Sequence, residues 1–219
     1  GVVNLVNRMD STRFIPGIIT FVPGGKLRER VDMSRVKVIE HLNKRPGNDW
    51  KLPAQLVQIF RREHPHIVHT HAWGTLCEGW LAVKLAHVPV WVHGEHGTIE
   101  KGMFNRIIQR CLWAQADQVL AVSQVLADRL ATTMRFPRKR IRAIVNGVDL
   151  NQFRPGIAVE SLRTSLGLSY DTHVIGIIGR LEPVKDHFTF LKAMTYVVKH
   201  HPDVCGLIIG DGSLRLFLQ

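Results

Sequence analysis

Small and polar residues follow several apolar runs of this sequence, at the points where strands are expected to end. They are His93-Gly94-Glu95-His96-Gly97 after Val92, Ser123 after Val122, Asn146-Gly147 after Val145, Gly179-Arg180 after Ile178, and Gly210-Asp211-Gly212 after Ile209. In open parallel sheets, ligands bind outside the carboxyl ends of the strands, where helix N-termini offer free amides. The pattern therefore predicts a ligand site along these strand ends, with glycines that let the backbone approach the ligand.

Two cations stand out in this pattern. Arg180 follows one apolar run, and Lys185 precedes a helix that is expected to start near Asp186. A guanidinium and an ammonium group beside a helix N-terminus suit a diphosphate. The simpler alternative stays open for each residue taken singly: the cations are solvated surface charges, and the glycines only turn the chain.

A dense group of histidines suggests a second kind of chemistry. His64, His66, His69 and His71 lie close together, and His69 and His71 share one face if they end a strand. Two such imidazoles are typical of metal-dependent hydrolases. No later ligand pattern and no His-Glu-x-x-His motif accompany them, so this hydrolase is an alternative hypothesis, with His64 and His66 favoured as loop residues.

A strongly basic composition raises a third possibility. The 219 residues carry a formal net charge of +11, with basic clusters at Arg138-Lys139-Arg140, Arg142, and Lys26 to Arg30. These clusters suggest a binding module for nucleic acid or an anionic membrane. A reader of nucleic acid should interleave aromatic residues with its basic patch, and that pattern is missing, so we expect no nucleic-acid partner.

Alternating strand and helix signals must position these residues. The expected strands are 18–22, 36–39, 67–69, 90–93, 118–122, 141–145, 174–178 and 204–209, and the expected helices are 2–9, 52–62, 76–86, 104–116, 124–131, 158–166 and 187–199. The alternation favours an α/β fold whose parallel sheets are covered on both faces. A break at 146–155 divides it into two Rossmann-like domains, 1–150 and 151–219, the second of them truncated.

Composition also bounds the location of the protein. No apolar run approaches the roughly 20 residues that span a bilayer, and no secretory signal is visible at the start of the sequence. The three cysteines, Cys77, Cys111 and Cys205, are odd in number and set among apolar neighbours. This usage is typical of buried residues in a reducing compartment, so we expect a cytoplasmic protein.

Several of these segments carry a resemblance to a known family. The run from Gly179 to Asp186, of sequence GRLEPVKD, resembles the donor-site motif of GT-B glycosyltransferases of family 4. Asn146-Gly147-Val148-Asp149, with Phe153 and Pro155, resembles the segment that enters the interdomain linker of that family. Ala121-Val122-Ser123 and Gly210-Asp211-Gly212 with Arg215 match in the same order, so the resemblance covers nearly the whole chain.

The resemblance implies a function and a set of site residues. It implies transfer of a sugar, of the hexosyl type, from a nucleotide-diphosphate sugar to a glycan or lipid-linked acceptor, with retention, without a metal or cofactor, and with no protein general base. Arg180 and Lys185 would hold the donor's diphosphate, and His96 would line the side of the reacting sugar. The implied substrate-binding residues are Gly179, Ser123, Asn146, Gly147, Gly210, Asp211 and Gly212.

Two departures from the family pattern limit these expectations. A first strand with its glycine-rich loop, and a later pair of glutamates that grips the donor's sugar and ribose, are both missing from the 219 residues. We therefore expect this piece alone to be inactive. The opening Gly1 to Leu5 and the segment 93–97 resemble bacterial sugar transferases of exopolysaccharide and exosortase systems, which implies such a subgroup. The basic clusters would then favour peripheral contact with the inner face of the cell membrane.

Overall fold

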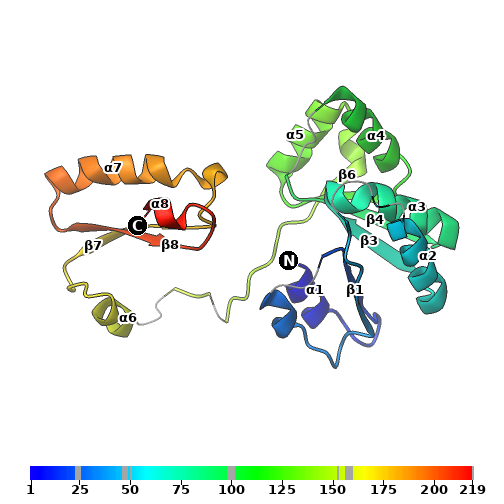
Figure 1. Cartoon of the computed structure of the whole chain (residues 1–219), viewed down its shortest axis with the longest axis horizontal. Helices are drawn as coiled ribbons and strands as arrows, with labels where there is room; N and C mark the ends of the chain where they lie inside the picture. Colours follow the sequence, from blue (N-terminus) through cyan, green and yellow to red (C-terminus); the bar gives the residue numbers. More distant parts are fainter. Residues whose placement is uncertain are drawn as a thin grey trace. The chain divides into compact units, whose positions relative to one another are not determined.

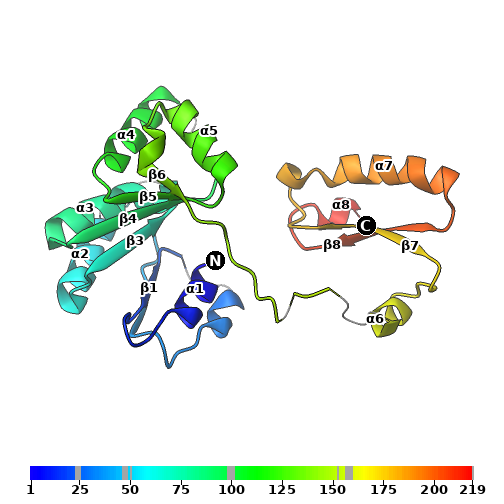
Figure 2. The same cartoon turned by 180° about the vertical axis from the view of Figure 1, so that it is seen from behind.

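A computed structural model describes residues 1–22, 26–45, 49, 51–97, 102–151, 153–155 and 160–218 of the chain. The chain divides into two compact units, Gly1–Asp149 and Leu150–Gln219, which we call unit 1 and unit 2. Figures 1 and 2 show strands accompanied by helices in each unit.

Unit 1 alternates strands and helices along most of its length. Its strands are β1 (Gly17–Thr20), β2 (Val38–His41), β3 (Ile67–His71), β4 (Val90–Glu95), β5 (Gln118–Ala121) and β6 (Ile141–Ala143). Its α-helices are α1 (Val2–Arg8), α2 (Lys51–Glu63), α3 (Leu76–Ala86), α4 (Met103–Trp113) and α5 (Gln124–Met134). The predicted succession of elements is confirmed, with ends that differ by a few residues.

All strand pairs described in unit 1 are parallel. β1 pairs with β2 in a two-stranded sheet, and β3, β4, β5 and β6 form a four-stranded sheet in sequence order. The register places His71 beside Gly94 and Thr70 beside His93. Because neighbours in register share a face, His69, His71 and Gly94 lie on one face of the sheet, while Thr70, His93 and Glu95 lie on the other.

The main core of unit 1 lies on the Thr70 face of the four-stranded sheet. Leu52 of α2, Leu76 of α3 and Leu130 of α5 have no exposed surface and belong to one apolar cluster with Trp113. Burying a leucine fully contributes about 2 kcal/mol relative to leaving it exposed, more than the helix propensity of any residue except proline. Packing of these apolar side chains therefore holds the helices against the sheet.

The opposite face is less covered than the sequence predicts. His69, His71, Val92 and Leu120 point to that face, and each is only half-buried. The expectation of a sheet covered on both faces therefore holds for one face only in the described part of the chain. The other face is less covered because α3 and α4 both pack on the Thr70 face. There Gly79 of α3 lies against Thr70, and Gln109 of α4 contacts Glu95.

The prediction that all the cysteines are buried is also wrong. Cys111 is exposed, and Cys77 and Cys205 are half-buried, all as free thiols. The helix α4 instead buries Gln109, Leu112 and Trp113, which recur at helical spacing on one side. Cys111 falls outside that stripe, although its neighbours in sequence are apolar.

The described residues of unit 2 form one parallel strand pair with helices. Strands β7 (His173–Ile178) and β8 (Val204–Ile209) pair along their full length. Its α-helices are α6 (Glu160–Ser165), α7 (His187–His200) and α8 (Arg215–Leu218), and a short 3-10 helix, η4 (Pro183–Lys185), follows β7. The predicted helix 158–166 begins outside the described residues, since 156–159 are not among them. Within the part of the chain that the structure describes, no helix combines the length and apolar character needed to cross a membrane.

Candidate functional site

The predicted cations of unit 2 lie at the carboxyl end of β7. Arg180 follows the strand directly, and Lys185 ends η4 immediately before α7. Both side chains are exposed, and neither forms an ion pair with any residue in the described ranges. The stem of Lys185 lies over Gly179, where a Cβ would stand 3.7 Å from it. Two cations are thus free to meet an anion here.

The N-terminus of α7 adds to this positive region. Asp186 caps the helix by accepting a hydrogen bond from the backbone N–H of Thr189, at 3.4 Å. A helix of this length carries a partial positive charge at its N-terminus, close to Lys185. This arrangement suits a diphosphate, although the site residues remain a prediction.

The glycines after β8 have a structural reason of their own. A Cβ on Gly210 would lie 1.9 Å from the carbonyl oxygen of Gly179, and one on Gly212 would lie 2.6 Å from that of Leu181. The two loops are joined there by backbone hydrogen bonds, from Gly179 N–H to Ile209 O at 3.0 Å and from Leu181 N–H to Asp211 O at 2.9 Å. Gly210 and Gly212 therefore let the chain approach itself, whatever they also do for a ligand.

Three predicted residues of unit 1 follow strand ends as expected. Ser123 is the N-cap of α5, where its hydroxyl accepts from the backbone N–H of Leu126 at 3.1 Å. Asn146 and Gly147 are exposed and come shortly after β6. Their positions agree with a site along the strand ends, and their contacts with a ligand remain a prediction.

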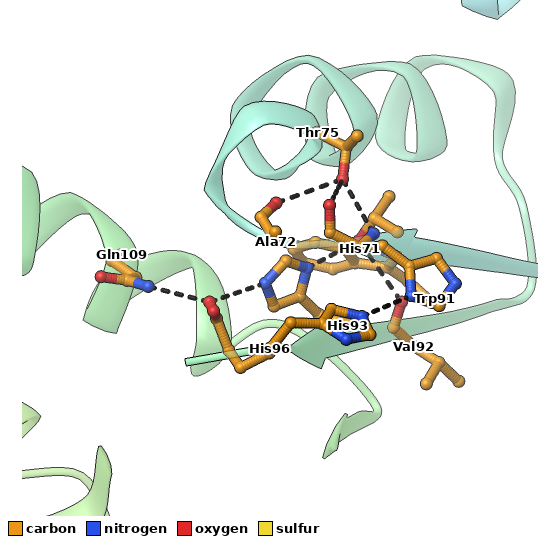
Figure 3. Close-up of polar contacts among 10 residues, drawn as sticks. His71, Ala72, Thr75, Trp91, Val92, His93, His96 and Gln109 are labelled. Atoms are coloured by element: carbon orange, nitrogen blue, oxygen red, sulfur yellow. Dashed lines mark hydrogen bonds and ion pairs between the residues drawn. The ribbon is translucent and has the colours of Figure 1, made fainter. Parts of the chain in front are cut away.

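His96 follows β4 and contacts a second histidine that the sequence did not assign to the same site. Its Nε2 lies 3.0 Å from Nδ1 of His71, which ends β3 (Figure 3). The ring of His71 also packs on that of His69, with centroids 4.0 Å apart. Gly94 lies beneath both rings, because a Cβ there would stand 2.9 Å from Nε2 of His69. Three imidazoles are thus gathered on one face of the sheet.

The other face of the same strands carries a buried polar network (Figure 3). The indole N–H of Trp91 donates to the hydroxyl of Thr70 at 3.0 Å, and that hydroxyl lies 2.8 Å from Nδ1 of His93. Nε2 of His93 lies 3.0 Å from Oε1 of Glu95, which also accepts from the Gln109 amide at 2.8 Å. We assign the proton of His93 to Nε2, since the Thr70 hydroxyl can then donate to Nδ1.

This network fixes the end of β4. Glu95 is wholly buried, and a buried carboxylate is costly unless charge-assisted hydrogen bonds hold it. Because Glu95 directly precedes His96, the chain is held on one face by His93 and Gln109 and on the other by His71. Sequence reasoning placed Glu95 in a loop and missed this role. The alternation of side chains along a longer β4 was the signal that could have found it.

The histidines do not form the metal site that the alternative hydrolase hypothesis requires. In the described ranges, no group of three or more His, Cys, Asp or Glu side chains is arranged to hold a metal ion. His64 and His66 are exposed before β3, whereas His69 and His71 stack on each other. The metal-dependent hydrolase built on these four residues is therefore not favoured.

Comparison with known proteins places the chain in a family. The sequence profile of Glycosyltransferase Family 4 matches residues 1–152, more than half of the chain. The chain belongs to this family.

Curated relatives agree with this assignment. The UDP-Gal:alpha-D-GlcNAc-diphosphoundecaprenol alpha-1,3-galactosyltransferase of Escherichia coli is 29% identical over 186 residues, which cover 76% of this chain and 46% of the relative. A D-inositol 3-phosphate glycosyltransferase of Segniliparus rotundus is 32% identical over 159 residues, covering 67% of this chain and 35% of the relative. The chain thus spans about half or less of the length of these relatives.

Solved structures confirm the α/β GT-B fold class. A glycosyltransferase from Rickettsia africae matches with a TM-score of 0.73 at 20% identity, covering 91% of this chain and 53% of that one. Anabaena Alr3699/HepE, crystallised with UDP and glucose, matches with a TM-score of 0.71 at 20% identity, covering 90% and 54% of the two chains.

The stacked histidines of this family member should make unit 1 sensitive to acid. Burial, with nearby histidines, lowers the pKa of His69 to about 4 and that of His71 to about 3, from an ordinary value of 6.5. Between these values the unfolded chain binds more protons than the folded one, so stability falls as the pH decreases from about 6.5 towards about 4.

We expect the free energy of unfolding, measured with urea at about pH 7.5 and about pH 5, to differ less in the double variant His69→Phe/His71→Phe than in the wild type. His66 is exposed, so His66→Phe is the matched control and should keep the wild-type difference. An unchanged difference in the double variant would show that other groups cause the acid sensitivity.

Proposed function

We propose that the protein containing this chain transfers a sugar from a nucleotide-diphosphate donor to a glycan or lipid-linked acceptor. The observation that carries the proposal is the pair of exposed cations, Arg180 and Lys185, beside the N-terminus of α7 in a chain of this family. Such a pair of cations can stabilise the negative charge that develops on a departing diphosphate. The names of similar proteins support it, since they include a UDP-galactose transferase and a protein crystallised with UDP-glucose.

The proposed roles divide between the two units. Gly179, Arg180, Lys185 and the Gly210 to Gly212 loop of unit 2 hold the donor's diphosphate. His96 of unit 1 faces the reacting sugar, with Ser123, Asn146 and Gly147 as further substrate contacts. Residues 1–150 thus form the acceptor-side domain and 151–219 the start of the donor-side domain.

We also propose the finer chemistry that the family resemblance implies. The reaction is a hexosyl transfer that retains the anomeric configuration and uses no metal or cofactor. The departing phosphate accepts the proton of the acceptor hydroxyl, so no protein side chain is assigned as general base. A bacterial role in exopolysaccharide synthesis is part of the same proposal.

The experiment is a donor panel with the full-length protein. We expect hydrolysis or transfer with one of the UDP-, GDP- and ADP-sugars in the presence of EDTA, and NMR of the first product should show the anomer of the donor. The isolated chain of 219 residues should be inactive in the same assay. Turnover that requires added zinc, or no turnover with any sugar nucleotide, would refute the proposal.

A peripheral contact with anionic membrane is a separate proposal. Within the basic cluster at 138–142, two cations are already engaged: Arg138 pairs with Asp128, and Arg140 donates to the carbonyls of Ala114 and Ala116. Lys139 and Arg142 remain exposed.

We expect the chain to bind vesicles that contain anionic lipid, and its affinity to fall as salt is raised, because exposed charges are screened within about 10 Å at 0.1 M salt. The variant Lys139→Glu/Arg142→Glu should bind more weakly, as judged by vesicle sedimentation. Equal binding to neutral and anionic vesicles would rule this contact out.

A further inference from the structure

The turn that carries His71 is held unusually firmly. The hydroxyl of Thr75 accepts from the backbone N–H of His71 at 2.8 Å and donates to its carbonyl oxygen, also at 2.8 Å. The backbone N–H of Ala72 donates to the carbonyl of Gly94 at 2.8 Å, which joins the turn to β4. One side chain thus satisfies both backbone groups of His71 (Figure 3).

In this turn, Ala72 adopts an unfavourable backbone conformation. Its φ of 60° and ψ of 170° fall in a region that residues other than glycine rarely adopt. Such a conformation costs on the order of 1–3 kcal/mol and persists only where the surroundings enforce it. The strained residue directly follows His71. The backbone strain therefore lies in the turn that orients this imidazole.

The contact between the two imidazoles couples their tautomers. His71 is neutral around pH 7, since burial and the nearby His69, His96, His93 and the N-terminal amine lower its pKa to about 3. Only one proton fits between Nδ1 of His71 and Nε2 of His96, which lie 3.0 Å apart. The tautomer of neutral His71 therefore dictates the tautomer of His96.

His96 itself is otherwise exposed, so its other nitrogen remains available to a ligand. We propose that His71 is a positioning residue, which holds Nε2 of His96 and so leaves Nδ1 of the neutral His96 imidazole, in one fixed tautomer, to meet the reacting sugar. This inference rests on the proposed function for the part that concerns the sugar. The contact between the two histidines stands on geometry alone.

Two substitutions of His71 separate the hydrogen bond from the ring. His71→Phe keeps an aromatic ring to pack on His69 and removes the hydrogen bond. His71→Asn loses the ring but places an amide atom close to the former position of Nδ1. In the full-length protein, we expect His71→Phe to lower kcat about tenfold with little change in the donor KM, because the misplaced group is needed in the transition state. His71→Asn should recover a substantial part of that loss.

A double-mutant cycle tests whether His71 acts through His96. In the His96→Ala background, His71→Phe should cause no further loss of kcat. A loss as large as in the wild-type background would mean that His71 only supports the fold, and an unchanged kcat in His71→Phe would equally overturn the proposal. His66→Phe is the matched control and should leave kcat unchanged.

A second readout does not depend on activity. Long-range ¹H–¹⁵N NMR of the imidazoles should show a single tautomer of His96 in the wild type, complementary to that of His71, and a mixture of tautomers in His71→Phe. An unchanged His96 spectrum in that variant would overturn the contact. If the wild-type protein turns over no sugar nucleotide, the proposed function fails, while the NMR measurement still decides the contact between the histidines.

Discussion

Arg180→Ala and Lys185→Ala are each expected to lower kcat/KM for the nucleotide-sugar donor at least about tenfold in the full-length protein. Both cations are exposed at the carboxyl end of β7, and neither forms an ion pair in the described part of the chain, although the charge of Arg180 helps to lower the pKa of Glu182. Their charge is therefore free for the diphosphate, whose negative charge grows as the sugar leaves. Initial rates with the donor identified in the panel give the measurement.

A matched control distinguishes this local effect from general electrostatics. Lys199 lies at the other end of α7 and is also exposed, so Lys199→Ala removes the same charge from the same helix. It should change kcat/KM less than about twofold, because the interaction of exposed charges weakens beyond a Debye length. Equal losses in Lys185→Ala and Lys199→Ala would mean that Lys185 has no specific role at the donor.

Gly210→Ala should destabilise unit 2 by about 3 kcal/mol or more. Its new methyl group would lie 1.9 Å from the carbonyl oxygen of Gly179, which is backbone and cannot swing aside. Relief would require the loops after β7 and β8 to separate, at the cost of the hydrogen bond from Gly179 N–H to Ile209 O. Urea unfolding followed by amide hydrogen exchange in β7 and β8 measures the effect.

The chain supplies two controls for this experiment. Gly176→Ala places its methyl group an ordinary 3.6 Å from the Leu207 carbonyl, so it should change stability by no more than about 1 kcal/mol. All tryptophans precede residue 150, so tryptophan fluorescence follows unit 1 alone and should not change in either variant. A Gly210→Ala protein that unfolds at the wild-type urea concentration would contradict the close approach of the two loops.

The order of elements could be predicted from the sequence because each carries a strong local pattern. The helix from Gln124, for example, has the serine cap before it and apolar residues at helical spacing, and α5 begins there. The ends of the strands could be predicted in the same way, because glycines and helix-capping residues mark the positions after them.

The contacts across the sheet could not be predicted, because they depend on register. The sequence predicts a strand that ends at His93, whereas β4 continues to Glu95, which pairs with Ala121 of β5. From the sequence, the carboxylate of Glu95 is expected in a loop unless its partners are known. One of those partners, Gln109, lies 14 residues away on a helix. The meeting of His71 and His96 has the same origin, since no local pattern joins the ends of two strands.

The backbone conformation of Ala72 creates a trade-off between the stability of the fold and the orientation of His71. Glycine adopts a φ of 60° with a ψ of 170° far more readily than alanine, so Ala72→Gly would remove strain from the folded state. The same change would free the turn that fixes the direction of His71. A search for more stable variants of this chain would therefore tend to accept Ala72→Gly. Selection for activity would tend to reject it, because the orientation of His71 and His96 would be less fixed.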